Sequence, residues 1–172
     1  MTHILLKRAL KSIMNYEITL SSDYRLEIWK PRLFQAMPTN CSLRMFIVLY
    51  ISFFIPILLG RDSYIIFIIR DALDFSIKHY SFVLPKYWKY PFMKENDFYI
   101  GPVWTDIAIR KQGIASYVLS EILKRYSGEG DIYWLTTKEN YASISLCKKF
   151  GFFEIGQVHC FLFGYSCLAK TI

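Results

Sequence analysis

The sequence predicts an α/β protein in which one sheet is covered by helices. Two observations indicate this fold class: apolar runs of strand length recur along the chain, and segments with helical apolar periodicity separate the later ones. A third is composition, because 53% hydrophobic and 18% aromatic residues exclude a disordered chain. A length of 172 residues suits one core, so we expect residues 1–172 to form a single domain.

The N-terminal region, residues 1–44, is expected to hold a helix followed by a strand. Residues 4–13 combine spaced apolar side chains with a basic face, a pattern typical of an amphipathic helix. Such a helix either packs on the domain or lies on anionic lipid, and the first interpretation is favoured because one basic face is a weak membrane signal. Residues 24–29 alternate as a strand does, and Pro31 closes that segment.

The apolar run at residues 45–59 raises the question of a membrane span. A spanning helix needs about 20 predominantly apolar residues, and this run is shorter. Extending it downstream would place Arg61 and Asp62 in the bilayer, at about 2.5 to 3.5 kcal/mol for each charge. We therefore reject a transmembrane span and expect a mostly buried helix that kinks or ends near Pro56. An interfacial membrane segment is the alternative.

The rest of the chain alternates expected strands and helices. Residues 64–69 are a continuous β-branched and aromatic run, which suits a central strand buried on both faces. Gly101 and Pro102 predict a bulge or bend inside a later strand. The further expected segments are a turn at 71–74, strands at 75–83, 98–105, 131–137, 155–163 and 165–170, and helices at 114–126 and from Asn140.

One loop runs from an expected strand into an expected helix and reads Arg110-Lys111-Gln112-Gly113-Ile114-Ala115. The first N–H groups of a helix have no partner inside it, and with the positive end of the helix dipole they form a site for phosphate. Gly113 lets a phosphate approach the backbone because glycine has no Cβ. Taken alone, the pattern is equally typical of a plain strand-to-helix turn.

A second segment lies downstream and reads Asn140-Tyr141-Ala142-Ser143-Ile144-Ser145-Leu146-Cys147-Lys148-Lys149-Phe150-Gly151-Phe152. It predicts a short helix with an asparagine N-cap and a glycine just beyond its last turn. The two segments together resemble the GNAT family of N-acetyltransferases, over roughly residues 97–156. The loop matches that family's Arg/Gln-x-x-Gly-x-Gly/Ala motif at Arg110, Gly113 and Ala115. The second segment matches its Asn-x-x-Ser-x-x-Leu-Tyr-x-Lys-x-Gly-Phe motif at Asn140, Ser143, Leu146, Lys149, Gly151 and Phe152.

The resemblance implies the family's mixed, mostly antiparallel sheet, with helices on both faces and two splayed parallel strands at the cofactor site. Those strands would be 98–105 and 131–137, inside a cofactor-binding core at 97–156. The resemblance further implies that acetyl coenzyme A (acetyl-CoA) enters between them and that the loop amides bind its pyrophosphate. The implied cofactor contacts, with no metal among them, are Trp104, Thr105, Arg110, Lys111, Gln112, Gly113, Ile114, Ala115, Ser116, Asn140 and Ser143.

Four residues are the candidates for catalysis. A free backbone N–H near Trp104 or Thr105 is the implied donor to the oxygen that gains charge. Cys147 stands where the family often has a tyrosine that protonates the thiolate, although a buried cysteine is more often a small hydrophobe. His79 titrates in the useful range for a general base, with a structural role as the alternative. Asp106 follows the strand end near the expected thioester, with a turn-stabilising role as the simpler interpretation.

The resemblance implies an N-acetyltransferase that moves an acetyl group from acetyl-CoA to a primary amine. Segments 79–83, 91–93 and 100–105 resemble GNAT members associated with bacterial surface polysaccharide synthesis. On that basis the acceptor would be an amino sugar, in one version nucleotide-linked, with a peptide or another small amine as the alternative. Two non-enzymatic readings stay open: an acyl-CoA-binding domain without turnover, and a basic protein that binds a membrane surface.

Charge and cysteine content indicate the expected partners and the cellular compartment. The formal net charge is +7, and the basic excess near the expected phosphate loop could attract a polyanion such as coenzyme A. No recognition motif accompanies the lysines, so we expect no nucleic-acid partner. The four cysteines form no CxxC pair and no signal peptide is evident, which predicts free thiols in the cytoplasm. We expect a monomer or homodimer, with peripheral contact to the inner membrane face as an added possibility.

Overall fold

The computed structural model describes residues 2–10, 17–31, 38–39, 64–87, 90–161 and 164–169. These residues form two compact units, and two elements, β5 (Phe98–Thr105) and α2 (Ile114–Arg125), contribute to both. The expected helix at 45–59 lies outside the described residues. The first unit takes its described residues from Met1–Asn15, Pro85–Gly101 and Leu123–Ile172, and the second from Tyr16–Leu84 and Pro102–Ile122.

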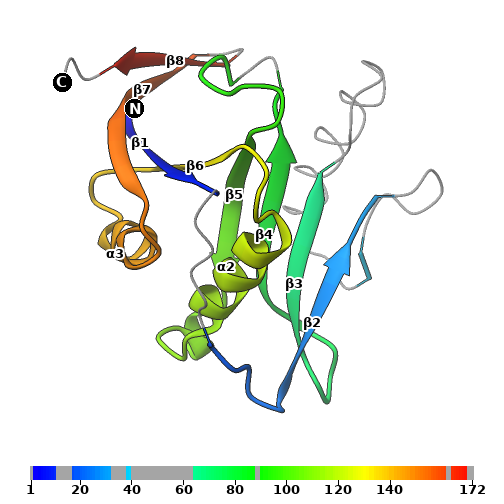
Figure 1. Ribbon diagram of the computed structural model, residues 1–172. Coiled ribbons are helices and arrows are strands. Elements are labelled where there is room, and N and C mark those ends of the chain that lie inside the picture. Colours follow the sequence, from blue (N-terminus) through cyan, green and yellow to red (C-terminus); the bar gives the residue numbers. More distant parts are fainter. Residues whose placement is uncertain are drawn as a thin grey trace. The chain divides into compact units, whose positions relative to one another are not determined.

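The second unit is built on a sheet whose strands run in the order β2 (Tyr24–Trp29), β3 (Ile65–Asp71), β4 (Ile77–Pro85) and the second half of β5. Figure 1 shows β2, β3 and β4 side by side, and both of their pairings are antiparallel. The strands predicted at 24–29 and 64–69 are confirmed. The central strand is buried on both faces, as its continuous apolar run predicts, through Ile66, Phe67, Ile68 and Ile69.

The turn between β3 and β4 confirms the turn predicted at 71–74. The Asp71 carboxylate accepts hydrogen bonds from the backbone N–H groups of Leu73 at 2.9 Å and Asp74 at 3.5 Å. Phe75 then adopts a left-handed backbone with φ 57°, which is not a strand conformation. The next strand therefore begins at Ile77, two residues later than the sequence predicts.

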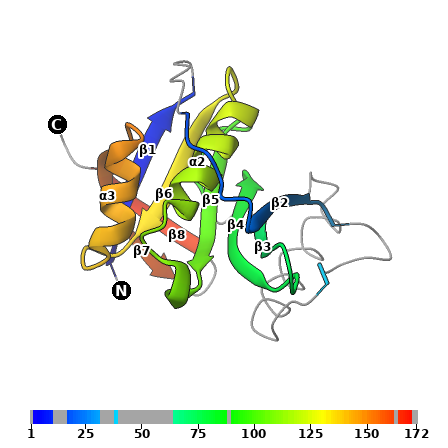
Figure 2. The same cartoon turned by 90° about the horizontal axis from the view of Figure 1, so that it is seen from below.

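The first unit contains a second set of strands in the order β5, β6 (Asp131–Thr136), β1 (Thr2–Ala9), β7 (Phe153–Phe161) and β8 (Gly164–Ala169). The first half of β5 pairs with β6 in parallel, and the other pairings are antiparallel. Helix α3 (Tyr141–Lys149) connects β6 to β7 and packs beside β6 (Figure 2). The strands and the helix predicted from residue 131 onward are thus confirmed, with strand bounds that differ by at most two residues.

The helix predicted at the N-terminus is wrong, because residues 2–9 form strand β1 between β6 and β7. Strand β1 is hydrogen-bonded on both edges, and its consecutive apolar residues are all buried: Ile4, Leu5 and Leu6. A strand covered on both faces has no reason to alternate polar and apolar residues, so its pattern imitates that of a helix.

The basic residues of β1 are used inside the first unit. Arg8 is buried and its Nη1 donates a 2.6 Å hydrogen bond to the carbonyl oxygen of Phe150, at the C-terminal end of α3. A cation there also complements the helix dipole. Lys7 forms an ion pair with Asp131 at 2.6 Å. This segment therefore does not present the lipid-facing basic helix that was the alternative, and none of the helices within the described ranges is long and apolar enough to cross a membrane.

Candidate active site

The loop that leads into α2 has the geometry of an anion site. Lys111 and Gly113 both adopt left-handed backbone, with φ 66° and 82°. The first helical hydrogen bond runs from the Tyr117 N–H to the Gly113 carbonyl oxygen at 2.8 Å, so the amides of residues 114–116 precede it and point out of the helix end. A Cβ built on Gly113 would meet no atom within 4 Å. The backbone here is open to a bound anion.

The charges around this loop favour an anion as well. Arg110 and Lys111 are exposed, and no acidic residue lies in the first turn of α2. The basic residues of the last turn, Lys124 and Arg125, lie at the opposite end, where cations complement the helix dipole. The positive end of α2 is therefore not neutralised by a carboxylate of its own first turn.

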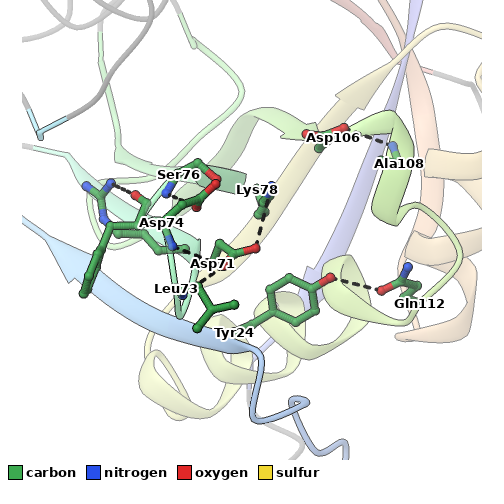
Figure 3. A network of polar contacts seen from close by, with 11 residues as sticks. Tyr24, Asp71, Leu73, Asp74, Ser76, Lys78, Asp106, Ala108 and Gln112 are labelled. Atoms are coloured by element: carbon green, nitrogen blue, oxygen red, sulfur yellow. Dashed lines mark hydrogen bonds and ion pairs between the residues drawn. The ribbon is translucent and has the colours of Figure 1, made fainter.

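Two side-chain hydrogen bonds hold the loop to neighbouring strands. The Arg110 Nε donates to the carbonyl oxygen of Thr105 at 3.2 Å, across the turn that follows β5. The Tyr24 hydroxyl, from the first residue of β2, donates to Gln112 Oε1 at 3.3 Å, and Figure 3 shows the two side chains reaching toward each other. Sequence reasoning missed Tyr24, because nothing in the sequence indicates which strand lies next to the loop.

Asp106 stabilises the turn after β5. Its backbone N–H donates to the Lys78 carbonyl oxygen at 2.9 Å, and its carboxylate accepts from the Ala108 N–H at 3.0 Å at the start of η1 (Ile107–Ile109), as Figure 3 shows for the second contact. Lys78 also forms an ion pair with Asp71 at 3.7 Å. This geometry favours the turn-stabilising interpretation of Asp106, whereas its catalytic role stays a prediction.

His79 lies on β4, its side chain is fully buried, and it contacts Thr105 on β5. Its ring Nδ1 is 2.7 Å from Thr105 Oγ1, and its Nε2 is 2.8 Å from Ser81 Oγ. Burial lowers the pKa of His79 to about 3, so the ring is neutral at physiological pH. These observations favour the structural alternative for His79, and a role as general base stays a prediction. Ser81 is a further member that sequence reasoning missed, although it stands two residues from His79 on the same strand face.

The opposite face of the same strand pair is aromatic. Tyr80 stacks on Trp104 with ring centroids 5.5 Å apart and an angle of 21° between the rings. Tyr80 also contacts Phe82 edge-on at 5.8 Å. Trp104 keeps 38% of its surface exposed, so its ring remains partly available to a ligand.

Helix α3, in the first unit, begins as its sequence predicts. The Asn140 side chain accepts a 3.2 Å hydrogen bond from the Ser143 N–H, which is the N-cap contact. Gly151 has φ 74° just beyond the helix end. Cys147 is fully buried, and burial raises the pKa of its thiol well above the usual value. That environment favours the small-hydrophobe interpretation of Cys147, and its role as a proton donor stays a prediction.

The parallel pairing of β5 with β6 ends early. It extends from Phe98 opposite Ile132 to Ile100 opposite Trp134, although both strands continue further. Gly101 follows with φ 149°, and a Cβ there would lie 2.6 Å from the Tyr99 hydroxyl. Pro102 has no N–H to donate to a neighbouring strand. The two residues at which the sequence predicts a bulge or bend therefore lie just beyond the end of the parallel pairing.

One family model matches part of the chain. The model of the acetyltransferase (GNAT) family matches residues 79–152, a segment that includes β5, the loop, α2 and α3. The GNAT resemblance inferred from the two motifs is thereby confirmed over this segment. No curated protein matches the sequence significantly.

Solved structures show the same fold at low sequence identity. A tandem GNAT protein from the clavulanic acid biosynthesis pathway has a TM-score of 0.64 at 12% identity, over 89% of this chain and 50% of its own. AAC(6′)-Iy, solved with the bisubstrate analogue CoA-S-monomethyl-acetylneamine, has a TM-score of 0.52 at 14% identity, over 80% of this chain and 97% of its own. A functionally unknown conserved protein from Staphylococcus epidermidis ATCC 12228 has a TM-score of 0.56 at 12% identity, over 91% of this chain and 58% of its own.

These comparisons confirm the predicted fold class, a mixed and mostly antiparallel sheet with one parallel strand pair and helices, in the arrangement of GNAT proteins. The chain spans about half the length of the tandem GNAT protein and of the staphylococcal protein.

Proposed function

We propose that this chain is an acetyl-CoA-dependent N-acyltransferase that moves an acetyl group to a primary amine. The observation that supports this most is the start of α2, inside the segment that matches the GNAT family. The amides of residues 114–116 point outward there, the space before Gly113 is open, and Arg110 and Lys111 add positive charge. A pyrophosphate is an anion of the charge and size that such a helix end binds.

The proposal gives the predicted cofactor residues separate tasks. Amides of residues 111–115 and the hydroxyl of Ser116 bind the pyrophosphate, while the backbone at Trp104 and Thr105 pairs with the pantetheine arm. In the first unit, the Asn140 Oδ1 is engaged by the Ser143 N–H. The Asn140 amide nitrogen is then the group of that side chain that would donate to a pantetheine carbonyl.

The chemistry needs little help from titrating side chains. The neutral amine nitrogen attacks the thioester carbonyl carbon, the C–N bond forms, the C–S bond breaks, and the thiolate leaves. Water carries away the proton that the amine loses. Because a thiol of pKa about 8.5 is a good leaving group, acid assistance contributes little at neutral pH. This agrees with the buried environments of His79 and Cys147.

As the finer form of the proposal, the acceptor is an amino sugar used in polysaccharide synthesis in the cytoplasm. The exposed part of Trp104, held by the Tyr80 ring, supports this because an aromatic face packs well on the apolar C–H face of a sugar. Peptides and other small amines are the competing acceptors. Thiol release from acetyl-CoA with a panel of amino sugars, nucleotide-linked amino sugars, peptides and linear amines distinguishes them.

The first test is thermal unfolding with and without acetyl-CoA. A ligand at about 100 times its Kd adds about 2.7 kcal/mol to the free energy of unfolding. For a domain of this size that raises the Tm by about 5 to 11 °C. No rise at saturating acetyl-CoA would overturn the proposal, whereas a rise without thiol release to any amine would indicate an acyl-CoA-binding domain without turnover.

Gly113→Ala and Gly128→Ala form a matched pair for this test. Both glycines adopt left-handed backbone, with φ 82° and 86°, and a Cβ on either meets no atom within 4 Å. Both variants should therefore lose about 1 to 2 kcal/mol of stability through the same backbone strain. Only Gly113→Ala should also lose the acetyl-CoA shift, because its Cβ would occupy the space of the phosphate. Equal shifts in the two variants would move the phosphate site elsewhere.

A further inference from the structure

The buried cluster of His79, Ser81 and Thr105 constrains where its hydrogens lie. A neutral imidazole has one N–H donor and one acceptor nitrogen. If Nδ1 carries the hydrogen, His79 donates to Thr105 Oγ1 at 2.7 Å and the Ser81 hydroxyl donates to Nε2 at 2.8 Å. If Nε2 carries it, His79 donates to Ser81 Oγ and the Thr105 hydroxyl donates to Nδ1.

Burial distinguishes the two arrangements. Ser81 is only 3% exposed, and within the described part of the chain His79 Nε2 is the acceptor that the structure places against its hydroxyl. In the Nε2–H arrangement the Ser81 hydroxyl would be a buried donor without that acceptor, which is costly. In the Nδ1–H arrangement the Ser81 hydroxyl has its acceptor and both ring nitrogens of His79 have hydrogen-bond partners. The one hydroxyl hydrogen without an acceptor in this cluster is then that of Thr105, which is half-buried.

Thr105 is the last residue of β5, next to the turn that leads to the loop before α2. The Asp106 N–H donates to the Lys78 carbonyl oxygen at 2.9 Å, and the Thr105 carbonyl oxygen accepts from the Arg110 Nε at 3.2 Å. The Thr105 side chain contacts His79, so Thr105 carries its side-chain O–H at the end of β5.

We propose that His79 is a positioning residue: by donating from Nδ1 to Thr105 Oγ1, it directs the Thr105 hydroxyl hydrogen toward the acyl carbonyl oxygen. That oxygen gains charge during attack and regains its double bond when the thiolate leaves, and the histidine itself neither takes nor gives a proton. The inference rests on the proposed function, and it makes the Thr105 hydroxyl a second donor beside the Thr105 N–H.

The hydrogen position can be measured without any ligand. Two-bond nitrogen–proton correlations of the wild-type protein labelled with ¹⁵N-histidine show which ring nitrogen carries hydrogen, and the spectrum of His79→Asn identifies the His79 signals by their absence. We expect the hydrogen on Nδ1. A hydrogen on Nε2 overturns the inference.

Kinetics of paired variants test the positioning role. Thr105→Val should lower kcat about 10²-fold with an unchanged Kd for acetyl-CoA, as expected for loss of one oxyanion donor, and Thr105→Ser should restore most of the rate. At position 79, asparagine places an amide near Nδ1, whereas glutamine places it near Nε2. His79→Asn should therefore retain most of kcat, and His79→Gln should lose it. Equal rates in the two folded variants overturn the inference.

A double-mutant cycle separates this role from general stability. If His79 acts through Thr105, adding Thr105→Val to His79→Gln should lower kcat little further, and additive losses contradict the inference. Its failure is distinguishable from failure of the proposed function. Absence of acetyl-CoA binding by the wild-type protein overturns both, whereas binding and turnover with hydrogen on Nε2 overturn only the role of His79.

Discussion

The two faces of the β4–β5 pair carry opposite chemistry, although their residues alternate along the same two strands. On one face, His79, Ser81 and Thr105 form a polar cluster that is closed by hydrogen bonds. On the other, Tyr80 and Trp104 stack as an aromatic pair that is partly exposed. Successive residues of a strand point to opposite sides, so both surfaces are built from the same short segments.

On the proposed function, this difference lets one strand pair serve chemistry on one face and recognition on the other. A hydroxyl that must point in one direction needs partners that do not exchange with water, and burial of His79 supplies them. A surface that accepts a ligand needs apolar area that is still exposed. On the aromatic face the exposed fraction of the side chains rises from Phe82, which is fully buried, to Trp104, which is 38% exposed. Trp104 therefore provides the exposed apolar area.

The largest expected effect is a difference in stability loss between alanine variants of Phe82 and Trp104, the buried and the exposed end of the aromatic face. Phe82→Ala should lower the free energy of unfolding by about 3 to 5 kcal/mol, because it removes a buried ring that contacts Tyr64 and Tyr80. Trp104→Ala should cost less, about 2 kcal/mol, since 38% of that residue is already exposed to solvent. Urea unfolding measures both. If the two variants lost similar free energies of unfolding, Trp104 would be as much a core residue as Phe82.

The next effect concerns the polar face and pH. Burial lowers the pKa of His79 to about 3 from an ordinary value of 6.5. Between these values the unfolded chain binds a proton that the folded protein does not. The stabilising contribution is therefore complete above about pH 6.5 and declines by about 1.4 kcal/mol for each pH unit below it. Unfolding in urea at pH 7.5 and 5.5 should differ by roughly that much more in the wild-type protein than in His79→Asn. Identical differences would mean that His79 is solvated.

The fold could be predicted wherever one local pattern had one structural meaning. The strands at 24–29 and 98–105 have the bounds that the sequence predicts, since alternation or turn residues mark them. The start of α3 follows from the capping preference of Asn140. The N-terminal strand was predicted as a helix because its burial on both faces depends on β6 and β7, which come more than a hundred residues later.

In the candidate site, too, the residues with local signals could be predicted and those with long-range partners could not. The loop at 110–115 could be predicted because a glycine before a helix has a local physical consequence. The partners of His79 could not, since they depend on the cross-strand register of β4 and β5, which the sequence does not state. For the same reason Tyr24 was missed, as its contact with Gln112 joins residues far apart in the chain.

The smallest expected effect tests whether the aromatic face recognises the acceptor. Because one aromatic contact contributes about 1 kcal/mol, Trp104→Ala should raise the acceptor KM about fivefold and leave the acetyl-CoA KM unchanged. Trp104→Phe, which keeps a ring to stack on Tyr80, should return most of that loss. Steady-state thiol release with each substrate varied in turn separates the two constants. A rise confined to the acetyl-CoA KM would assign the exposed ring to the cofactor, and the two faces of the strand pair would then serve the same substrate.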